Sequence, residues 1–154
     1  MPIQVPKVAL LIETSRGYGR AMLRGVVHYA RLHGPWEFYI TPGDFEQALP
    51  DMKHWGGSGI IARIETPKIA QTILGSGLPT IVLDMSQNIP IDIPPTAHFS
   101  EIASDSHGAA RLAAEHLLTL GLKHFAYIGD ASRAWSKNRE DGFQQRLRED
   151  GYAT

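Results

Sequence analysis

Two carboxylates stand where short apolar runs of the chain end. Glu13 directly follows the first such run and Asp84 ends a later one. An ionised carboxylate accepts hydrogen bonds only, so both side chains are suited to the hydroxyl groups of a ligand. Each also has a structural alternative, because Glu13 could cap the helix that follows and Asp84 could fold into the next loop. Glu13 and Asp84 are therefore candidate ligand-binding residues.

The polar loop after the first apolar run offers an aromatic and a cationic side chain. Tyr18 and Arg20 lie in this loop, and Gly17 and Gly19 beside them allow the backbone to approach a ligand closely. The alternative is a simple turn in which the tyrosine packs on the following helix. Binding is the interpretation that we carry forward for Tyr18 and Arg20.

A second group of candidates lies later in the chain. Asp105 precedes a helical pattern, so N-capping is its structural alternative. Trp135 could stack on a ligand or pack at an interdomain hinge. Arg139 carries five donors that could serve two adjacent hydroxyls, and its alternative is an ion pair with Glu140 or Asp141. Asp105, Trp135 and Arg139 complete the set of candidate ligand-binding residues.

Other chemistries lack the spacing that they require. The chain has seven histidines, but none forms a close pair with metal-ligand spacing. The loop at residues 16–19 lacks both the three-glycine fingerprint and the Gly-Lys-Ser/Thr ending of nucleotide-binding loops. The serines have no nucleophile-elbow context. We therefore expect no metal, no cofactor and no enzymatic activity.

Composition favours a folded protein without nucleic-acid affinity of its own. The chain has 154 residues, of which 43% are hydrophobic, and 15 Lys and Arg nearly balance 16 Asp and Glu. This balance provides no basic surface for a polyanion. Cysteine is absent, and no run of about 18 apolar residues suggests a membrane span. The start has no apolar run long enough for a signal sequence, so a cytoplasmic location is expected.

Apolar runs alternate with helical patterns along the first two thirds of the chain. The runs predict strands at residues 8–12, 58–63 and 80–84, and the alternation places further strands at 36–41 and 98–103. Between them, helices are predicted at 20–33, weakly at 44–55, and at 67–75. Such alternation is typical of the α/β class, with a mostly parallel sheet flanked by helices. In such a sheet, we expect the ligand-binding residues to lie just beyond the carboxyl ends of the strands.

The last third of the chain predicts a further helix, strand and helix. Asp105 or Ser106 can cap a helix that Gly121 closes in a left-handed conformation. A buried strand is expected at 124–130, and a helix at 135–149. The apolar face of the first of these helices is predicted to consist of Ala110, Ala113, Ala114, Leu117, Leu118 and Leu120.

Four local features together resemble the sensor half of the xylose operon regulators, within the lactose-repressor family. They are Tyr18-Gly-Arg20, the stretch from His54 to Ile61, Asp105, and the stretch from Trp135 to Glu140. The resemblance covers almost the whole chain. It implies a periplasmic-binding-protein-like lobe plus the start of a second lobe, with residues 1–121 in the first and 122–154 opening the second. It also implies that this chain is part of a longer protein.

The resemblance further implies a ligand and partners. The ligand would be a monosaccharide, D-xylose, held between the lobes by Tyr18, Arg20 and Asp105 from one side and Arg139 from the other. Arg139 stands in the Arg-x-x-Gly-Phe pattern that aims an arginine at the ligand in this family. A homodimer is implied, with DNA bound only through an AraC-type region outside this chain. No membrane partner is implied.

Two other functions remain open at this point. One is a flavodoxin-like or receiver-like α/β enzyme or signalling domain that uses Asp84 or Glu13. A receiver needs a clustered acidic pocket and a lysine after a late strand, and no lysine follows Tyr127-Ile-Gly129. The other is a periplasmic sugar-binding protein, which would carry a signal peptide upstream.

Overall fold

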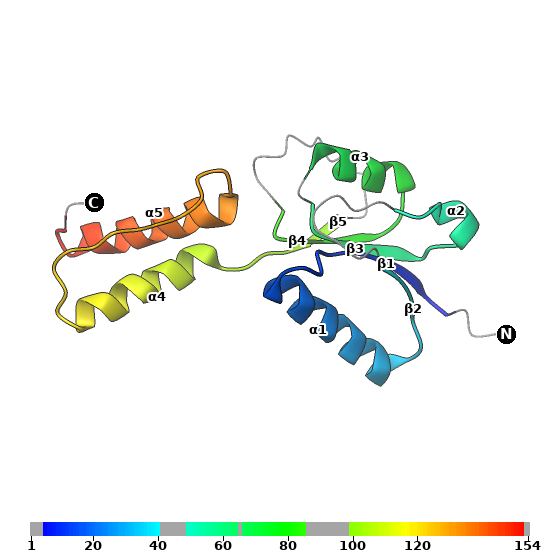
Figure 1. The fold of residues 1–154 in the computed structure, drawn as a ribbon, viewed down its shortest axis with the longest axis horizontal. Helices are drawn as coiled ribbons and strands as arrows, with labels where there is room; N and C mark the ends of the chain where they lie inside the picture. The colour runs from blue at the N-terminus through cyan, green and yellow to red at the C-terminus, as the bar shows by residue number, and fades with distance from the viewer. Residues whose placement is uncertain (1–4, 41–48, 65, 86–98, 153–154) are drawn as a thin grey trace. The chain divides into compact units, whose positions relative to one another are not determined.

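The computed structural model describes residues 5–40, 49–64, 66–85 and 99–152, which fall into two compact units. The first unit extends to Ile102 and contains a sheet with its helices (Figure 1). The second begins at Ala103 and contains two long helices. The helix before Gly121 belongs to the second unit, because it packs on the last helix of the chain. The division into lobes at residue 121 stays a prediction.

The first unit is built on a parallel sheet of five strands, in the order β2-β1-β3-β4-β5, as predicted for the α/β class. Because every pair is parallel, all the carboxyl ends meet at one edge of the sheet. Each strand agrees with its predicted position to within one or two residues. The strands are β1 (Lys7–Leu11), β2 (Glu37–Ile40), β3 (Gly59–Ala62), β4 (Thr80–Leu83) and β5 (Phe99–Ile102).

Helices cover both faces of this sheet. α1 (Gly17–His33) lies on one side and α3 (Pro67–Ser76) on the other (Figure 1). α3 follows local rules at both ends: the Thr66 hydroxyl accepts a hydrogen bond of 3.3 Å from the Ile69 backbone N–H, and Gly77 ends the helix with φ 65°. The predicted helix 67–75 is therefore confirmed with one further residue.

The main core lies between the sheet and α3. Burial of each large aliphatic side chain there contributes about 1.5–3 kcal/mol. The strand residues alternate in direction, so every second one enters this core. Its buried members are Ala9, Leu11, Ile60, Ala62, Ile64, Ile69, Ala70, Ile73 and Val82.

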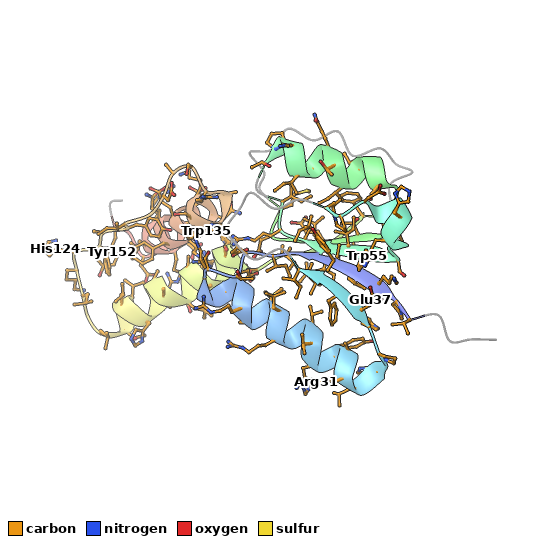
Figure 2. The ribbon with its side chains drawn as sticks, turned by 45° about the vertical axis from the view of Figure 1, so that its right-hand side comes forward. Arg31, Glu37, Trp55, His124, Trp135 and Tyr152 are labelled. Atoms are coloured by element: carbon orange, nitrogen blue, oxygen red, sulfur yellow. The ribbon has the colours of Figure 1, made fainter. Side chains whose placement is uncertain are left out.

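The weakly predicted helix at 44–55 is seen only at its end. α2 spans Met52–Trp55, and residues 41–48 lie outside the described part of the chain. Trp55 ties α2 to the sheet, because its indole N–H donates a hydrogen bond of 3.1 Å to Oε1 of Glu37 on β2. Figure 2 labels both side chains, which come from neighbouring elements of the first unit.

The second unit is a pair of helices, α4 (Ser106–Thr119) and α5 (Ala134–Glu149). The side chain of Asp105 caps α4 by accepting a hydrogen bond of 2.7 Å from the Gly108 N–H, and Gly121 has φ 75° after it, both as predicted. The buried residues between the helices are Ala110, Ala114, Phe143 and Leu147.

Two features of this helix pair explain its close packing. A Cβ built on Gly142 would lie 2.6 Å from the carbonyl oxygen of His107, so only glycine lets α5 approach α4 there. Charged side chains join the same helices farther along: Arg111 forms a two-bond pair with Glu149 at 2.7 and 2.8 Å, and Arg146 bonds Glu115 at 3.1 Å.

Two predictions for this unit are wrong. Residues 124–130 form no strand, and Ile128 is 96% exposed. A strand needs a hydrogen-bonding partner, and none of the described strands pairs with this segment. The predicted apolar face of α4 is also too wide, since Ala113 and Leu120 are exposed beside the Ala110–Ala114 contact.

Candidate functional site

The carboxyl edge of the sheet holds a buried ion pair between the first and third strands. Glu13 lies two residues after β1 and Arg63 directly follows β3. The Arg63 N–H bonds the Leu11 carbonyl at 2.9 Å, which continues the β1–β3 ladder and brings the side chains together. Nη1 of Arg63 donates to Oε1 of Glu13 at 2.6 Å, and the two side chains are 12% and 1% exposed.

One oxygen of this pair is left without a donor. Oε2 of Glu13 is buried and accepts no hydrogen bond from the described residues. A buried acceptor without a donor costs about 1–3 kcal/mol, and more when it carries charge. The capping alternative for Glu13 is not observed, because the carboxylate is turned into this pair and the N-cap residue of α1, Arg16, makes no side-chain capping bond.

Tyr18 and Asp84 extend the ion pair into a cluster. The Tyr18 hydroxyl donates a hydrogen bond of 2.5 Å to Oδ2 of Asp84, at the end of β4. The Arg63 guanidinium carbon lies 5.3 Å from the centre of the Tyr18 ring, within cation–π range. Three of the predicted residues, Glu13, Tyr18 and Asp84, therefore lie in one cluster, with Arg63 at its centre. We call these four residues the carboxyl-edge cluster.

Gly19 fixes the start of α1 against this cluster. A Cβ on Gly19 would collide with the backbone carbonyl of Glu13, so the close approach that glycine allows here is to the chain itself rather than to a ligand. Arg20 is also used locally. Its Nη1 donates to the carbonyls of Thr14 at 3.1 Å and Ser15 at 2.7 Å, which braces the loop. A ligand role for Arg20 stays a prediction.

In the second unit, Trp135 and Arg139 lie together on α5. The Arg139 guanidinium carbon is 4.9 Å from the centre of the Trp135 ring, and Figure 2 labels Trp135 at the start of the helix. The predicted alternative, an ion pair of Arg139 with Glu140 or Asp141, is not seen among the described residues, because helix residues one or two positions apart do not face each other. Both carboxylates pair instead with Lys137, at 3.3 and 2.8 Å. The hydrogen bonds that Lys137 donates to Asp141 and Glu140 raise the pKa of Lys137 above its ordinary value.

This exposed stack of a cation on an indole combines a flat apolar surface with several donors. Asp105 belongs to the same unit, at the N-terminus of α4, whereas the resemblance grouped it with Tyr18 and Arg20. The reason is again the packing of α4 on α5. Asp105 is exposed, and its capping role is established by the bond to Gly108.

Two residues of these sites escaped the sequence analysis. Arg63 ends an apolar run as Glu13 and Asp84 do, so the same signal marks it. Ser136 is 2% exposed and fixes the start of α5: its Oγ accepts from the Asp130 N–H at 2.9 Å, and its carbonyl accepts from the Tyr127 hydroxyl at 2.8 Å. A serine in a helix carries no comparable signal.

The model of the XylR N-terminal domain family, PBP1_XylR, matches residues 7–107, which is more than half of the chain. The chain belongs to this family. A curated relative, the xylose operon regulatory protein of Escherichia coli strain K12, is 27% identical over 150 residues. The match covers 95% of this chain and 37% of that protein, so this XylR-type chain spans little more than a third of its relative's length.

Solved structures place this XylR-type chain in the expected fold. The lac repressor dimer bound to operator and the anti-inducer ONPF has a TM-score of 0.71 at 17% identity, covering 99% of this chain and 54% of that one. An ABC transporter solute-binding protein from Burkholderia multivorans has a TM-score of 0.69 at 16% identity, covering 97% and 59%. The fold is thus lactose-repressor-like and periplasmic-binding-protein-like.

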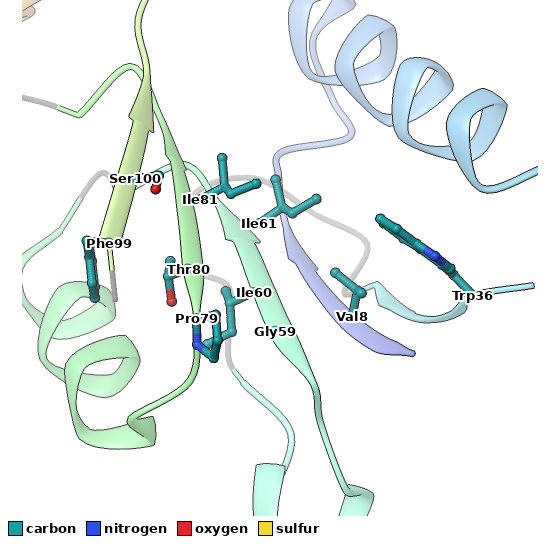
Figure 3. Close-up of a pocket in the computed structure, with 10 residues that line it drawn as sticks. All are labelled: Val8, Trp36, Gly59, Ile60, Ile61, Pro79, Thr80, Ile81, Phe99 and Ser100. Atoms are coloured by element: carbon teal, nitrogen blue, oxygen red, sulfur yellow. The ribbon is translucent and has the colours of Figure 1, made fainter. Parts of the chain in front are cut away.

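A hollow of about 490 Å³ in this XylR-type chain lies away from the candidate residues (Figure 3). Val8, Gly59, Thr80 and Phe99 line it near the amino ends of their strands, opposite the carboxyl-edge cluster. Its lining is mainly apolar, so it lacks the paired donors and acceptors that a polar ligand needs. The described residues contain no group of three or more potential metal ligands. None of the helices described is long and apolar enough to span a bilayer.

Proposed function

We propose that this chain is the ligand-sensing part of a bacterial transcription regulator, that it binds a monosaccharide, and that the monosaccharide is D-xylose. The family match over residues 7–107 carries the proposal. The name of the Escherichia coli relative supports xylose as the ligand. The chemistry of the carboxyl-edge cluster is compatible, because it offers carboxylate acceptors, a phenol and a guanidinium at the edge where open α/β sheets bind ligands.

The two units would supply different parts of the contact with a pentose. Tyr18 and Asp84 would bond hydroxyls from the first unit. Arg139 would donate to adjacent hydroxyls from the second, and the neighbouring Trp135 ring would cover an apolar C–H face of the sugar. Arg20, Glu13 and Asp105 complete the proposed set of binding residues.

Signalling would follow from closure of the two units on the sugar. A ligand shifts a conformational equilibrium only by its differential affinity for the two states. A sugar that bonds Tyr18 and Arg139 at once satisfies this condition, because it makes both sets of contacts only in the closed state. In this proposal residues 1–121 contribute to the first lobe and residues 122–154 open the second.

The output would lie beyond this chain. The regulator would be a cytoplasmic homodimer without enzymatic activity, and it would bind DNA through an AraC-type region outside these residues. A periplasmic sugar-binding protein is the second candidate, favoured by the fold shared with the Burkholderia multivorans protein. The full reading frame separates the two candidates. A downstream helix-turn-helix supports the regulator, and an upstream signal peptide supports the periplasmic sugar-binding protein.

The direct test is calorimetric titration of the intact protein with D-xylose, L-arabinose, D-glucose and D-xylose 5-phosphate. The proposal expects D-xylose to bind most tightly and to raise the melting temperature, since a ligand that binds only the folded state stabilises it. If saturating D-xylose gives no heat of binding and no change in melting temperature, while another sugar clearly binds, xylose is refuted as the ligand. The absence of binding by every sugar would refute the sensing role itself.

A further inference from the structure

Arg63 occupies the centre of the carboxyl-edge cluster but is not its most accessible member. Its side chain is 12% exposed and that of Glu13 1%, whereas Tyr18 is 42% exposed. A ligand arriving from solvent therefore meets Tyr18 before the ion pair. The guanidinium contacts Glu13 through Nη1 at 2.6 Å and the Tyr18 ring at 5.3 Å, so it links the buried carboxylate to the exposed phenol.

We propose that Arg63 is a positioning residue of the sugar site, which acts on the ligand through Tyr18. This inference rests on the proposed function and deepens it. The buried carboxylate of Glu13 fixes the guanidinium, and the guanidinium fixes the plane of the Tyr18 ring. With the ring in this plane, the Tyr18 hydroxyl lies 2.5 Å from Oδ2 of Asp84 and donates a hydrogen bond to it. Since the phenolic proton is directed to Asp84, the Tyr18 oxygen meets a sugar hydroxyl as an acceptor.

The geometry of the backbone supports the proposal that Glu13 positions Arg63 and that Arg63 positions Tyr18. Glu13 and Arg63 are anchored by the β1–β3 ladder, including the 2.9 Å bond from the Arg63 N–H to Leu11. Gly19 lets the first turn of α1 pack against the Glu13 carbonyl, and this contact fixes the backbone position of the neighbouring Tyr18. A tyrosine side chain has two main rotatable bonds, and the guanidinium on its face and the Asp84 carboxylate at its tip restrict both. Arg63 thus determines the direction of the hydroxyl.

The chemistry of arginine makes it hard to replace in this position. Its planar guanidinium can bond a carboxylate at one edge while its face lies on an aromatic ring. Lysine keeps the charge that Glu13 requires, but its ammonium cannot make the same planar stack. Arg63→Lys therefore separates the two contacts: the pair with Glu13 is retained and the orientation of Tyr18 is lost.

The test is a double-mutant cycle in the intact protein with Arg63→Lys, Tyr18→Phe and the combined variant. We expect Arg63→Lys to weaken D-xylose binding roughly twofold to thirtyfold, the range of cation–π interactions. We expect the double variant to bind like Tyr18→Phe alone, because the arginine acts through the phenol. Arg31→Lys, the same exchange at an exposed position of α1, is the matched control and should bind as the wild type. Additive losses in the cycle would overturn the proposal.

A second measurement needs no sugar. The ¹³Cζ resonance of Tyr18 in tyrosine-labelled protein, assigned with Tyr18→Phe, should shift in Arg63→Lys and stay in place in Arg31→Lys. An unmoved resonance in Arg63→Lys would overturn the proposal even if binding falls. If the wild type binds no sugar, the proposed function fails while this resonance still decides the role of Arg63. Should Arg63→Lys not fold, Glu13→Gln combined with Arg63→Gln removes the cation without leaving a buried charge, and the same shift is expected.

Discussion

The Tyr18 hydroxyl donates a hydrogen bond to Oδ2 of Asp84, which connects the first turn of α1 to the carboxyl end of β4. Asp84 is also the one residue other than glycine with positive φ among those described, at 47°. Aspartate and asparagine tolerate this left-handed region better than other side chains. The backbone and the hydrogen bond at Asp84 therefore impose separate requirements, which substitutions can distinguish.

Asp84→Asn should leave the free energy of unfolding nearly unchanged, because asparagine adopts the same backbone and retains an acceptor oxygen. Asp84→Ala should lower it by about 1–2 kcal/mol, the cost of placing alanine in the left-handed region. Asp84→Gly is the control, since it relieves the backbone while removing the side chain. Urea unfolding of the three variants measures these differences. Equal stability of the alanine and glycine variants would contradict the conformational explanation.

Gly19→Ala should destabilise the first unit, because the added methyl group meets the backbone carbonyl of Glu13, which cannot move without shifting β1. The expected loss is roughly 1–3 kcal/mol, typical of overpacking. Gly25→Ala on the same helix is the matched control, since a Cβ there has no neighbour within 4 Å. It should raise stability by about 0.5–1 kcal/mol through the better helix propensity of alanine. Thermal unfolding followed by circular dichroism measures both, and equal melting temperatures for the two variants would argue against the close approach.

Arg63→Met should be strongly destabilising, because it leaves the Glu13 carboxylate buried without its partner. Breaking a buried pair in this way costs about 3–5 kcal/mol. Glu13→Leu combined with Arg63→Met should recover most of that loss, since neither charge then remains. Chemical denaturation of the single and double variants provides the comparison. A double variant as unstable as Arg63→Met would show that the damage comes from lost packing rather than from the uncompensated charge.

Arg139→Ala in the intact protein should weaken D-xylose binding roughly tenfold to hundredfold, which corresponds to about 1.5–3 kcal/mol for a charge-assisted hydrogen bond. Lys137→Ala, two positions earlier on α5, is the control, because Lys137 forms exposed ion pairs with Glu140 and Asp141. Such pairs contribute little, so sugar affinity should stay the same. Calorimetry provides both affinities. Equal binding by wild type and Arg139→Ala would remove Arg139 from the site.

The Arg111–Glu149 pair predicts how acid affects the two-helix unit. The hydrogen bond from Arg111 lowers the pKa of Glu149 below its ordinary value of 4.5. A carboxyl with a depressed folded-state pKa stabilises the fold above its unfolded pKa, and this contribution is lost as the pH falls through the folded value. Glu149→Gln should therefore be less stable than wild type at neutral pH, and the difference should shrink below pH 4.5. A difference that does not change with pH would show that the pair is not the cause.

Local rules recovered much of the fold from the sequence. Asp105 and Gly121 delimit α4 through a side-chain cap and a left-handed residue, and both depend only on their neighbours in the chain. The apolar runs identified β1, β3 and β4, because strands in the centre of a parallel sheet are buried and have continuous hydrophobic sequences. The strands β2 and β5 at the edges of the sheet are mostly exposed, and they were predicted from the alternation of strands and helices. The segment at 124–130 has the same kind of sequence as the central strands, but a strand also requires a partner, which local sequence does not specify.

The members of the carboxyl-edge cluster were predicted in part for similar reasons, while their binding role stays a prediction. Glu13 and Asp84 were predicted because parallel strands bring their carboxyl ends to one edge. Tyr18 was predicted from the polar stretch after the first strand, and the structure places it in the first turn of α1. Arg63 meets the same criterion at the end of β3, although it was not predicted as a site residue. The bonds of Arg20 to the Thr14 and Ser15 carbonyls depend on the path of a loop, so residue type alone did not reveal them.

The contact at Gly142 has a mechanical consequence for the second unit. Gly142 brings the backbone of α5 against the His107 carbonyl in the first turn of α4, and Arg139 lies one turn earlier on α5. We therefore expect the two helices to move together as one rigid body. A displacement of Arg139 would then also displace His107, which lies five residues beyond the last strand of the sheet.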